Sequence, residues 1–328
     1  MSLPDIIFGT GLFGIYEGSN FDTAEMVQAA VDILRNHGTT GIDTARRYPS
    51  QNSGTSEQVL GQADLQDLII DTKVWSMPGC HTPAELQKSI NESFRALNLS
   101  KVNILYLHMP DPDTPLQDVC KGMNDIYLQG KFARFGISNF TITQIKQMLD
   151  ICEAKHYIKP TVYQGAYNAL ARNAESELLP LLRENGISFY SYWSAAGGAF
   201  NSSSTRMADK GPVGDLWRAQ YGGAAKYIVK VSDAAARCGL TGHAVALSWV
   251  LHHSALRGEH GDAIVFGART LDQLRQTLEA CHAGPLPNQI VDLVEETWDA
   301  VKDSAPPYTM FGEKQGESGN AMGALLKR

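Results

Sequence analysis

Eight short apolar segments alternate with segments of helical periodicity, and this alternation constrains the fold more than any other feature of the chain. The apolar segments have the length of strands and span residues 6–8, 39–43, 68–73, 103–107, 132–137, 161–164, 187–190 and 262–266. Predicted helices follow them, from about residues 23, 55, 83, 114, 141, 175, 224, 242 and 271. Strands that alternate with helices form a parallel sheet through crossovers, so the sequence predicts an α/β fold, a (β/α)8 TIM barrel.

An open, doubly wound sheet is the alternative fold, and it would bind a dinucleotide at a GxGxxG turn after its first strand. The stretch from Gly9 to Gly14 matches that pattern. However, no carboxylate ends a strand about twenty residues further on, as the dinucleotide-binding pattern requires. We therefore interpret the glycines as a loop at the mouth of a barrel.

The chain of 328 residues is predicted to form one barrel domain over residues 1–312, followed by a C-terminal tail at 313–328. Residues 195–224 interrupt the repeat with two Gly-Gly pairs and three consecutive serines. A long loop of this kind inside a compact domain is usually functional, so we predict a lid there.

The net charge of −7 and the lack of a dense basic cluster argue against a nucleic-acid partner. The five cysteines are widely spaced and form no CxxC pair, which predicts neither a disulfide framework nor a metal site. No apolar run reaches the roughly 18 residues that span a membrane, and no leader pattern is present at the start. These features favour a cytoplasmic protein that does not bind membranes.

Ionisable side chains follow three of the predicted strands. Asp43 ends the second strand and Tyr48 follows five residues later, while Lys73 and His108 follow the third and fourth strands. A nearby ammonium would favour the phenolate and lower the pKa of the tyrosine, and a carboxylate would hold the lysine in place. A neutral imidazole could then orient a carbonyl oxygen, so the four groups suit carbonyl reduction.

Carbonyl reduction needs a hydride, which a nicotinamide cofactor would supply. Ser138, Asn139 and Gln164 follow or end later strands and could hydrogen-bond its carboxamide, and Tyr192 could stack on its ring. Structural roles remain open for three of them: Asn139 could cap a helix, Gln164 could satisfy buried backbone, and Tyr192 could belong to the core.

A phosphate site is predicted after the eighth strand. Gly267 to Thr270 open the helix that carries Gln273 and Thr277, and TIM barrels often bind phosphate at such a helix start. Arg269 could clamp a 2′-phosphate there, or it could be a solvated arginine at the start of a helix.

Several motifs together resemble those of the aldo-keto reductases, most closely the aflatoxin-aldehyde reductase branch. The resemblance covers residue 6 to about 309. It rests on Ile42-Asp43-Thr44-Ala45 with Tyr48, Ser56-Glu57-Gln58-Val59-Leu60-Gly61, Thr72-Lys73-Val74-Trp75, Leu105-Tyr106-Leu107-His108-Met109-Pro110-Asp111, Gly130-Lys131-Phe132, Gly136-Ile137-Ser138-Asn139 and Val162-Tyr163-Gln164-Gly165-Ala166-Tyr167-Asn168.

The resemblance implies an NADPH-dependent reductase of aldehydes or ketones with Tyr48 as proton donor, in a branch whose members are typically homodimers. It assigns catalysis to Asp43, Tyr48, Lys73 and His108, the carboxamide contacts to Ser138, Asn139 and Gln164, and ring stacking to Tyr192. It assigns binding of the adenosine 2′-phosphate to Gly267, Arg269, Thr270, Gln273 and Thr277.

Four segments depart from the branch. Trp193 to Ala196 replace an Asn-Pro-Leu run, and Thr277 replaces a common asparagine that contacts adenine. Arg46-Arg47 precede the tyrosine in place of apolar residues, and residues 307–311 lack the arginine that holds acidic substrates. The missing arginine favours a bulkier, less charged substrate, aromatic or polyketide-like, of the kind found in secondary metabolism.

Two other functions remain open on the same fold. One is a cofactor-binding regulatory subunit like the potassium-channel β subunits. The other is a lyase or isomerase that reuses Tyr48 and Lys73 without net hydride transfer. Four intact catalytic groups favour the reductase.

Overall fold

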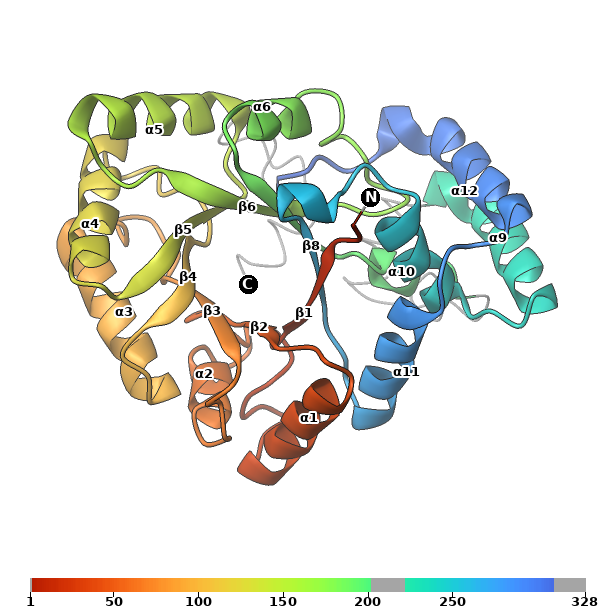
Figure 1. The fold of residues 1–328 in the computed structure, drawn as a ribbon, viewed down its shortest axis with the longest axis horizontal. Coiled ribbons are helices and arrows are strands. Elements are labelled where there is room, and N and C mark those ends of the chain that lie inside the picture. Colours follow the sequence, from red (N-terminus) through yellow and green to blue (C-terminus); the bar gives the residue numbers. More distant parts are fainter. Residues whose placement is uncertain (1, 202–221, 310–328) are drawn as a thin grey trace.

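A computed structural model describes residues 2–201 and 222–309 and contains a closed barrel of parallel strands in the order β1 to β8 (Figure 1). The strands are β1 Asp5–Gly9, β2 Gly41–Asp43, β3 Ile69–Lys73, β4 Val102–Leu107, β5 Phe132–Ser138, β6 Pro160–Ala166, β7 Ser188–Tyr192 and β8 Ala263–Phe266. The barrel closes because β8 pairs with β1, with Ile264 beside Ile6. The predicted (β/α)8 fold is confirmed.

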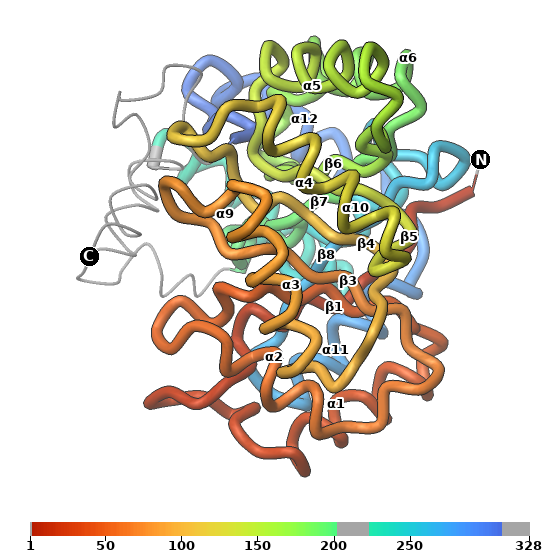
Figure 2. Tube along the Cα trace, turned by 90° about the vertical axis from the view of Figure 1, so that its left-hand side faces the viewer, coloured from red at the N-terminus to blue at the C-terminus, as the bar shows by residue number. Residues whose placement is uncertain are grey.

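Helices surround the barrel in Figure 1, and the side view in Figure 2 keeps α5 and α6 at the top and α1 at the bottom. The helices are α1 Ala24–Asn36, α2 Thr55–Leu60, α3 Pro83–Leu97, α4 Leu116–Leu128, α5 Ile142–Lys155, α6 Leu178–Glu184, α9 Ala225–Arg237, α10 Gly242–His252, α11 Leu271–His282 and α12 Asn288–Val301. Short 3-10 turns lie at Ala196–Gly198, Gly222–Ala224, Gly258–His260 and Lys302–Ser304.

Threonine caps set the starts of several helices, because the hydroxyl oxygen accepts a backbone N–H that the first turn leaves unpaired. The capping threonines are Thr23, Thr82, Thr141, Thr241 and Thr270. Pro83 also follows Thr82 at the first position of α3, where proline costs no hydrogen bond.

Apolar side chains pack on both sides of the strands. One cluster lies between the strands and the surrounding helices, and a smaller one fills the barrel with side chains such as Ile7, Ile104, Tyr106 and Val162. The barrel is therefore a packed core, and chemistry is confined to its ends.

Several elements differ from the prediction. Helix α12 has no counterpart in the predicted elements, α6 begins at Leu178 and not near residue 175, and β7 runs on to Tyr192. Of the predicted lid at 195–224, only 195–201 and 222–224 are among the described residues. The predicted boundary between 312 and 313 lies outside them.

Candidate active site

Lys73 and Asp43 form a buried ion pair at the carboxyl end of the barrel. The Nζ atom of Lys73 donates a short hydrogen bond to Oδ2 of Asp43 and a second one, of 3.0 Å, to the carbonyl oxygen of Thr44. The exposed fraction of Lys73 is 0% and that of Asp43 is 2%. The pair is fixed by parallel pairing, since both residues end neighbouring strands.

Tyr48 lies over this ion pair, on the loop that follows β2. The Lys73 Nζ atom is 4.9 Å from the centroid of the Tyr48 ring. The Tyr48 ring is also edge-on to the ring of His108, with centroids 5.5 Å apart and planes at 87°. The four predicted catalytic side chains therefore converge at one mouth of the barrel.

Burial controls the protonation of these groups. Burial raises the pKa of Tyr48, and it outweighs the lowering effect of Lys73 that the sequence led us to expect. Burial also lowers the pKa of His108 well below its ordinary range, with help from the positive charges of Lys73 and Arg47, so its imidazole is neutral. Burial disfavours the charged form of Lys73, but Asp43 and Tyr48 hold its pKa above the ordinary value.

The predicted carboxamide ligands lie beside these groups and are linked to them. Gln164 Nε2 donates to Asp43 Oδ1 at 2.9 Å. Asn139 Nδ2 donates to the His108 carbonyl oxygen at 3.1 Å and to Ser138 Oγ at 3.0 Å, while its Oδ1 accepts from the Tyr192 hydroxyl at 2.9 Å. Polar donors and acceptors thus gather from β5, β6 and β7 next to the catalytic groups.

These contacts decide between the structural alternatives for two residues. The cap of α5 is Thr141 and not Asn139, which has a positive φ of 65°. Gln164 bonds a carboxylate side chain, and no backbone hydrogen bond of its amide is among the described contacts. The hydrogen bond from Tyr192 to Asn139 was not foreseen from the sequence.

The predicted phosphate residues surround the start of α11. Arg269 is exposed, its backbone N–H donates to Gln273 Oε1 at 2.9 Å, and Thr270 caps the helix. Gly267 lies against β1, where an added Cβ would approach the Gly9 carbonyl oxygen to 3.5 Å. A helix start with an exposed guanidinium beside it suits an anion such as a phosphate.

Thr277 is placed differently from these four. It is buried, and its Oγ1 lies 2.9 Å from Nε2 of His243 at the start of α10. His243 was missed by the sequence analysis, since a lone histidine beside a distant helix gives no pattern to detect.

Arg47, Ser76 and Asp111 also line this end of the barrel and were not predicted as site residues. Arg47 Nη1 donates to the carbonyl oxygen of Ser76 at 3.2 Å. Asp111 accepts the backbone N–H groups of Gly79 and His81, each at 2.9 Å. Asp111 therefore joins the loop after β4 to the loop after β3.

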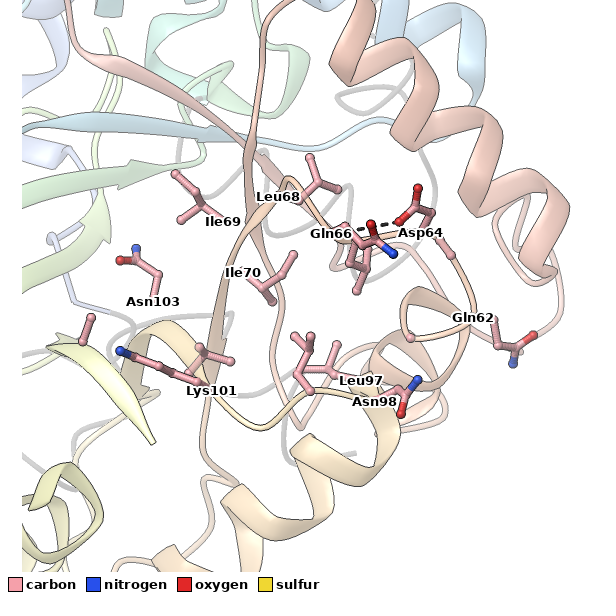
Figure 3. A pocket seen from close by; sticks show the side chains of 16 residues that line it. Gln62, Asp64, Gln66, Leu68, Ile69, Ile70, Leu97, Asn98, Lys101 and Asn103 are labelled. Atoms are coloured by element: carbon pink, nitrogen blue, oxygen red, sulfur yellow. Dashed lines mark hydrogen bonds between the residues drawn. The ribbon is translucent and has the colours of Figure 1, made fainter. Parts of the chain in front are cut away.

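A groove of about 860 Å³ lies at the opposite, amino-terminal end of the strands (Figure 3). It is lined by the loops that enter β3 and β4, with Ile69, Lys101 and Asn103 among the side chains drawn there. Active sites of TIM barrels lie at the carboxyl ends of the strands, so this groove is separate from the candidate active site.

The described residues hold neither a grouped set of metal ligands nor a membrane-spanning helix. Among residues 2–201 and 222–309, no three His, Cys, Asp or Glu side chains are grouped to hold a metal ion. In the same part of the chain, no helix combines the length and apolar character needed to cross a membrane.

Comparison with known proteins identifies relatives over nearly the whole chain. The model of the Aldo/keto reductase family matches residues 5–299. Oxidoreductase sirO of Leptosphaeria maculans is 34% identical over 325 residues, covering 94% of this chain and 97% of the relative. Human aflatoxin B1 aldehyde reductase member 2 is 33% identical over 334 residues, covering 94% and 91%. Human aldo-keto reductase family 7 member A3 is 33% identical over 295 residues, covering 83% and 88%. These matches confirm the resemblance found in the motifs, and the chain belongs to the aldo/keto reductase family.

Proposed function

We propose that the protein is an NADPH-dependent reductase that converts an aldehyde or ketone to an alcohol, with Tyr48 as the proton donor. The observation that carries this proposal is the convergence of Asp43, Tyr48, Lys73 and His108 at one mouth of the barrel. A purely regulatory subunit, or an enzyme without net hydride transfer, has less need of all four groups.

Each of these side chains has a separate task in the proposed reaction. The Tyr48 hydroxyl hydrogen-bonds the substrate carbonyl oxygen and gives it a proton as the alcohol forms. Lys73 stabilises the resulting phenolate, and Asp43 fixes the position of the ammonium. The neutral imidazole of His108 donates a hydrogen bond to the same carbonyl oxygen and orients it.

The cofactor would be held by residues on four strand ends. A bound nicotinamide supplies the hydride, and Ser138, Asn139 and Gln164 provide hydroxyl and amide groups suited to its carboxamide. The ring of Tyr192 would stack on the nicotinamide. The adenosine 2′-phosphate end would be bound by Gly267, Arg269, Thr270, Gln273 and Thr277. The guanidinium of Arg269 would give the enzyme its preference for NADPH over NADH.

The proposed substrate is a bulky, aromatic or polyketide-like carbonyl compound. Trp193 follows Tyr192 directly, adopts a positive φ of 61° and places a large aromatic side chain at the mouth, which suits aromatic ligands. Fungal relatives include the aldo-keto reductase pigE of Monascus ruber, 31% identical over 332 residues. We also propose that the enzyme is cytoplasmic, belongs to secondary metabolism and acts as a homodimer. In this proposal residues 195–224 form a lid and residues 313–328 a C-terminal tail.

The test is turnover by purified wild type and Tyr48→Phe with a panel of aromatic and dicarbonyl substrates. We expect wild type to oxidise NADPH and the variant to lose about a hundredfold to ten thousandfold in kcat, as for loss of a general acid. Tyr127→Phe, which changes an exposed tyrosine of α4, should leave kcat unchanged. Near-wild-type turnover by a folded Tyr48→Phe would remove Tyr48 as proton donor, and NADPH binding without turnover would favour the regulatory subunit.

A further inference from the structure

Two consecutive arginines precede Tyr48, and their guanidinium groups are engaged in different ways. Arg46 faces two carboxylates, with Nη1 at 3.4 Å from Glu57 and Nε at 3.2 Å from Glu92. Arg47 donates one hydrogen bond, to the carbonyl oxygen of Ser76. No carboxylate within the described ranges lies at ion-pair distance from Arg47, so only Arg46 has an evident structural role.

Arg47 lies at the same mouth of the barrel as the four catalytic side chains. It directly precedes Tyr48 in the chain, and its partner Ser76 is three residues beyond Lys73. After burial itself and the charge of Lys73, the charge of Arg47 is the next cause of the lowered pKa of His108. Because Asp43 neutralises Lys73, Arg47 adds a positive charge to this mouth, and no carboxylate of the described residues forms an ion pair with it.

Arg47 is half-buried, and partial loss of water lowers the pKa of its guanidinium. A guanidinium stays charged in proteins, and one that is partly removed from water is costly unless an anion meets it. An anion that binds here would therefore relieve an existing cost, which makes binding more favourable.

The wall beside Arg47 is held in place and offers a second polar group. The Ser76 hydroxyl is buried and has no hydrogen-bond partner among the described residues. Asp111 fixes the loop that follows it through the N–H groups of Gly79 and His81. A buried hydroxyl without a partner is unusual, and an acceptor on a ligand that reaches Ser76 would satisfy it.

We propose that Arg47 and Ser76 form a subsite for an anionic oxygen of the substrate, so that the enzyme selects carbonyl compounds with a carboxylate or an ionised phenol close to the reacting carbonyl. This inference rests on the proposed reductase function. It revises the expectation of a less charged substrate, which considered only the arginine missing from residues 307–311. In this chain Arg47, which lies next to Tyr48 on the loop after β2, supplies the positive charge in place of that missing arginine.

The experiment uses matched aromatic aldehydes with the full-length protein. The first pair is meta-carboxybenzaldehyde and its methyl ester, and the second is an ionised hydroxynitrobenzaldehyde and its methyl ether. The variants are Arg47→Gln, which removes the charge, and Arg47→Lys, which keeps it. Arg95→Gln makes the same charge change at an exposed position of α3 and serves as the matched control.

We expect Arg47→Gln to lower kcat/KM for the anionic member of at least one pair by about tenfold to a hundredfold, the usual effect of losing a hydrogen bond to a charged group. The ester and ether should change little, Arg47→Lys should recover part of the loss, and Arg95→Gln should behave as wild type. Which pair responds identifies the anion as a carboxylate or a phenolate. Equal losses for the charged and neutral members would overturn the proposal.

A binding measurement separates this inference from the proposed function. Calorimetric titration of benzoate and benzamide into wild type and Arg47→Gln, with and without NADP⁺, needs no turnover. Benzoate binding that weakens only in Arg47→Gln supports the subsite even if no aldehyde is reduced. The subsite is disproved if benzoate binds wild type no better than benzamide does and the enzyme shows no preference for anionic aldehydes.

Discussion

Tyr48 and His108 lie against each other, and burial favours the uncharged form of both side chains. Removal from water keeps the phenol protonated, because the phenolate is the charged form, and keeps the imidazole neutral, because the imidazolium is charged. A protonated phenol and a neutral imidazole with an N–H toward the substrate can each donate a hydrogen bond to a carbonyl oxygen. These are the protonation states that carbonyl reduction requires, and the free enzyme holds them at neutral pH.

The pH dependence of reduction follows from these shifts. Reduction needs the protonated form of Tyr48, whose raised pKa keeps it protonated until the pH exceeds the ordinary value of 10.0. His108 has a pKa well below its ordinary 6.5, so it does not charge as the pH falls through that value. We expect kcat/KM for a neutral aldehyde to be level between pH 6.5 and 10.0 and to fall only at higher pH, where Tyr48 loses its proton.

Initial rates of NADPH oxidation across this range, with the enzyme checked for folding at each pH, measure the profile. The aldehyde must be neutral so that Arg47 adds no pH dependence. A fall in kcat/KM on acidification through pH 6.5 would mean that His108 is an ordinary, solvated imidazole, contrary to its burial.

Local patterns predicted most elements because each carries its own signal. The strand segments are apolar and short, and threonine caps mark the starts of α1, α3, α5, α10 and α11. Helix α12 was missed: its cap position is Pro287, without a side-chain hydrogen bond, and it follows α11 with no strand between them. A repeat of alternating strands and helices gives no place for a second consecutive helix there.

Contacts between distant residues could not be predicted in the same way. The order of the strands brought Asp43, Lys73 and His108 together, since parallel strands end at one edge. The bond from Gln164 to Asp43 joins residues 121 positions apart and depends on barrel closure and register. The different partners of Arg46 and Arg47 likewise depend on where two side chains of one loop point.

Helix α12 is joined to the rest of the molecule by a cluster around Arg172. This arginine is 6% exposed, stacks 4.0 Å above the Trp249 ring and lies 2.6 Å from Glu295 of α12. The other carboxylate oxygen of Glu295 accepts from Trp249 Nε1 at 3.1 Å. Loss of the carboxylate would leave a buried guanidinium without its anion.

We therefore expect Glu295→Gln to lower the free energy of unfolding by about 1–3 kcal/mol, a range reduced from fully buried pairs because Glu295 is partly exposed. Asp299→Asn, which breaks an exposed pair with Lys302 on the same side of the molecule, should cost about 0–1 kcal/mol. Denaturant unfolding measures both. Equal effects would show that the cluster does not anchor α12.

At the scale of the whole molecule, cofactor binding and unfolding are linked because the proposed binding residues come from β5, β6, β7 and α11. A ligand that binds only the folded barrel stabilises all of it, by about 2.7 kcal/mol at a hundred times its dissociation constant. The melting temperature should therefore rise with NADPH, and rise more than with the same concentration of NADH if Arg269 contacts the 2′-phosphate.

Arg269→Ala should remove the difference between NADPH and NADH and leave the rise with NADH in place. Arg275→Ala is the matched control, since Arg275 is an exposed arginine of the same helix that pairs with Asp272 at 2.9 Å. It should keep the wild-type difference. Thermal unfolding with each cofactor gives the comparison without any substrate. If Arg269→Ala lowers both shifts equally, the arginine supports α11 and not the phosphate, and NADPH selectivity must come from another residue.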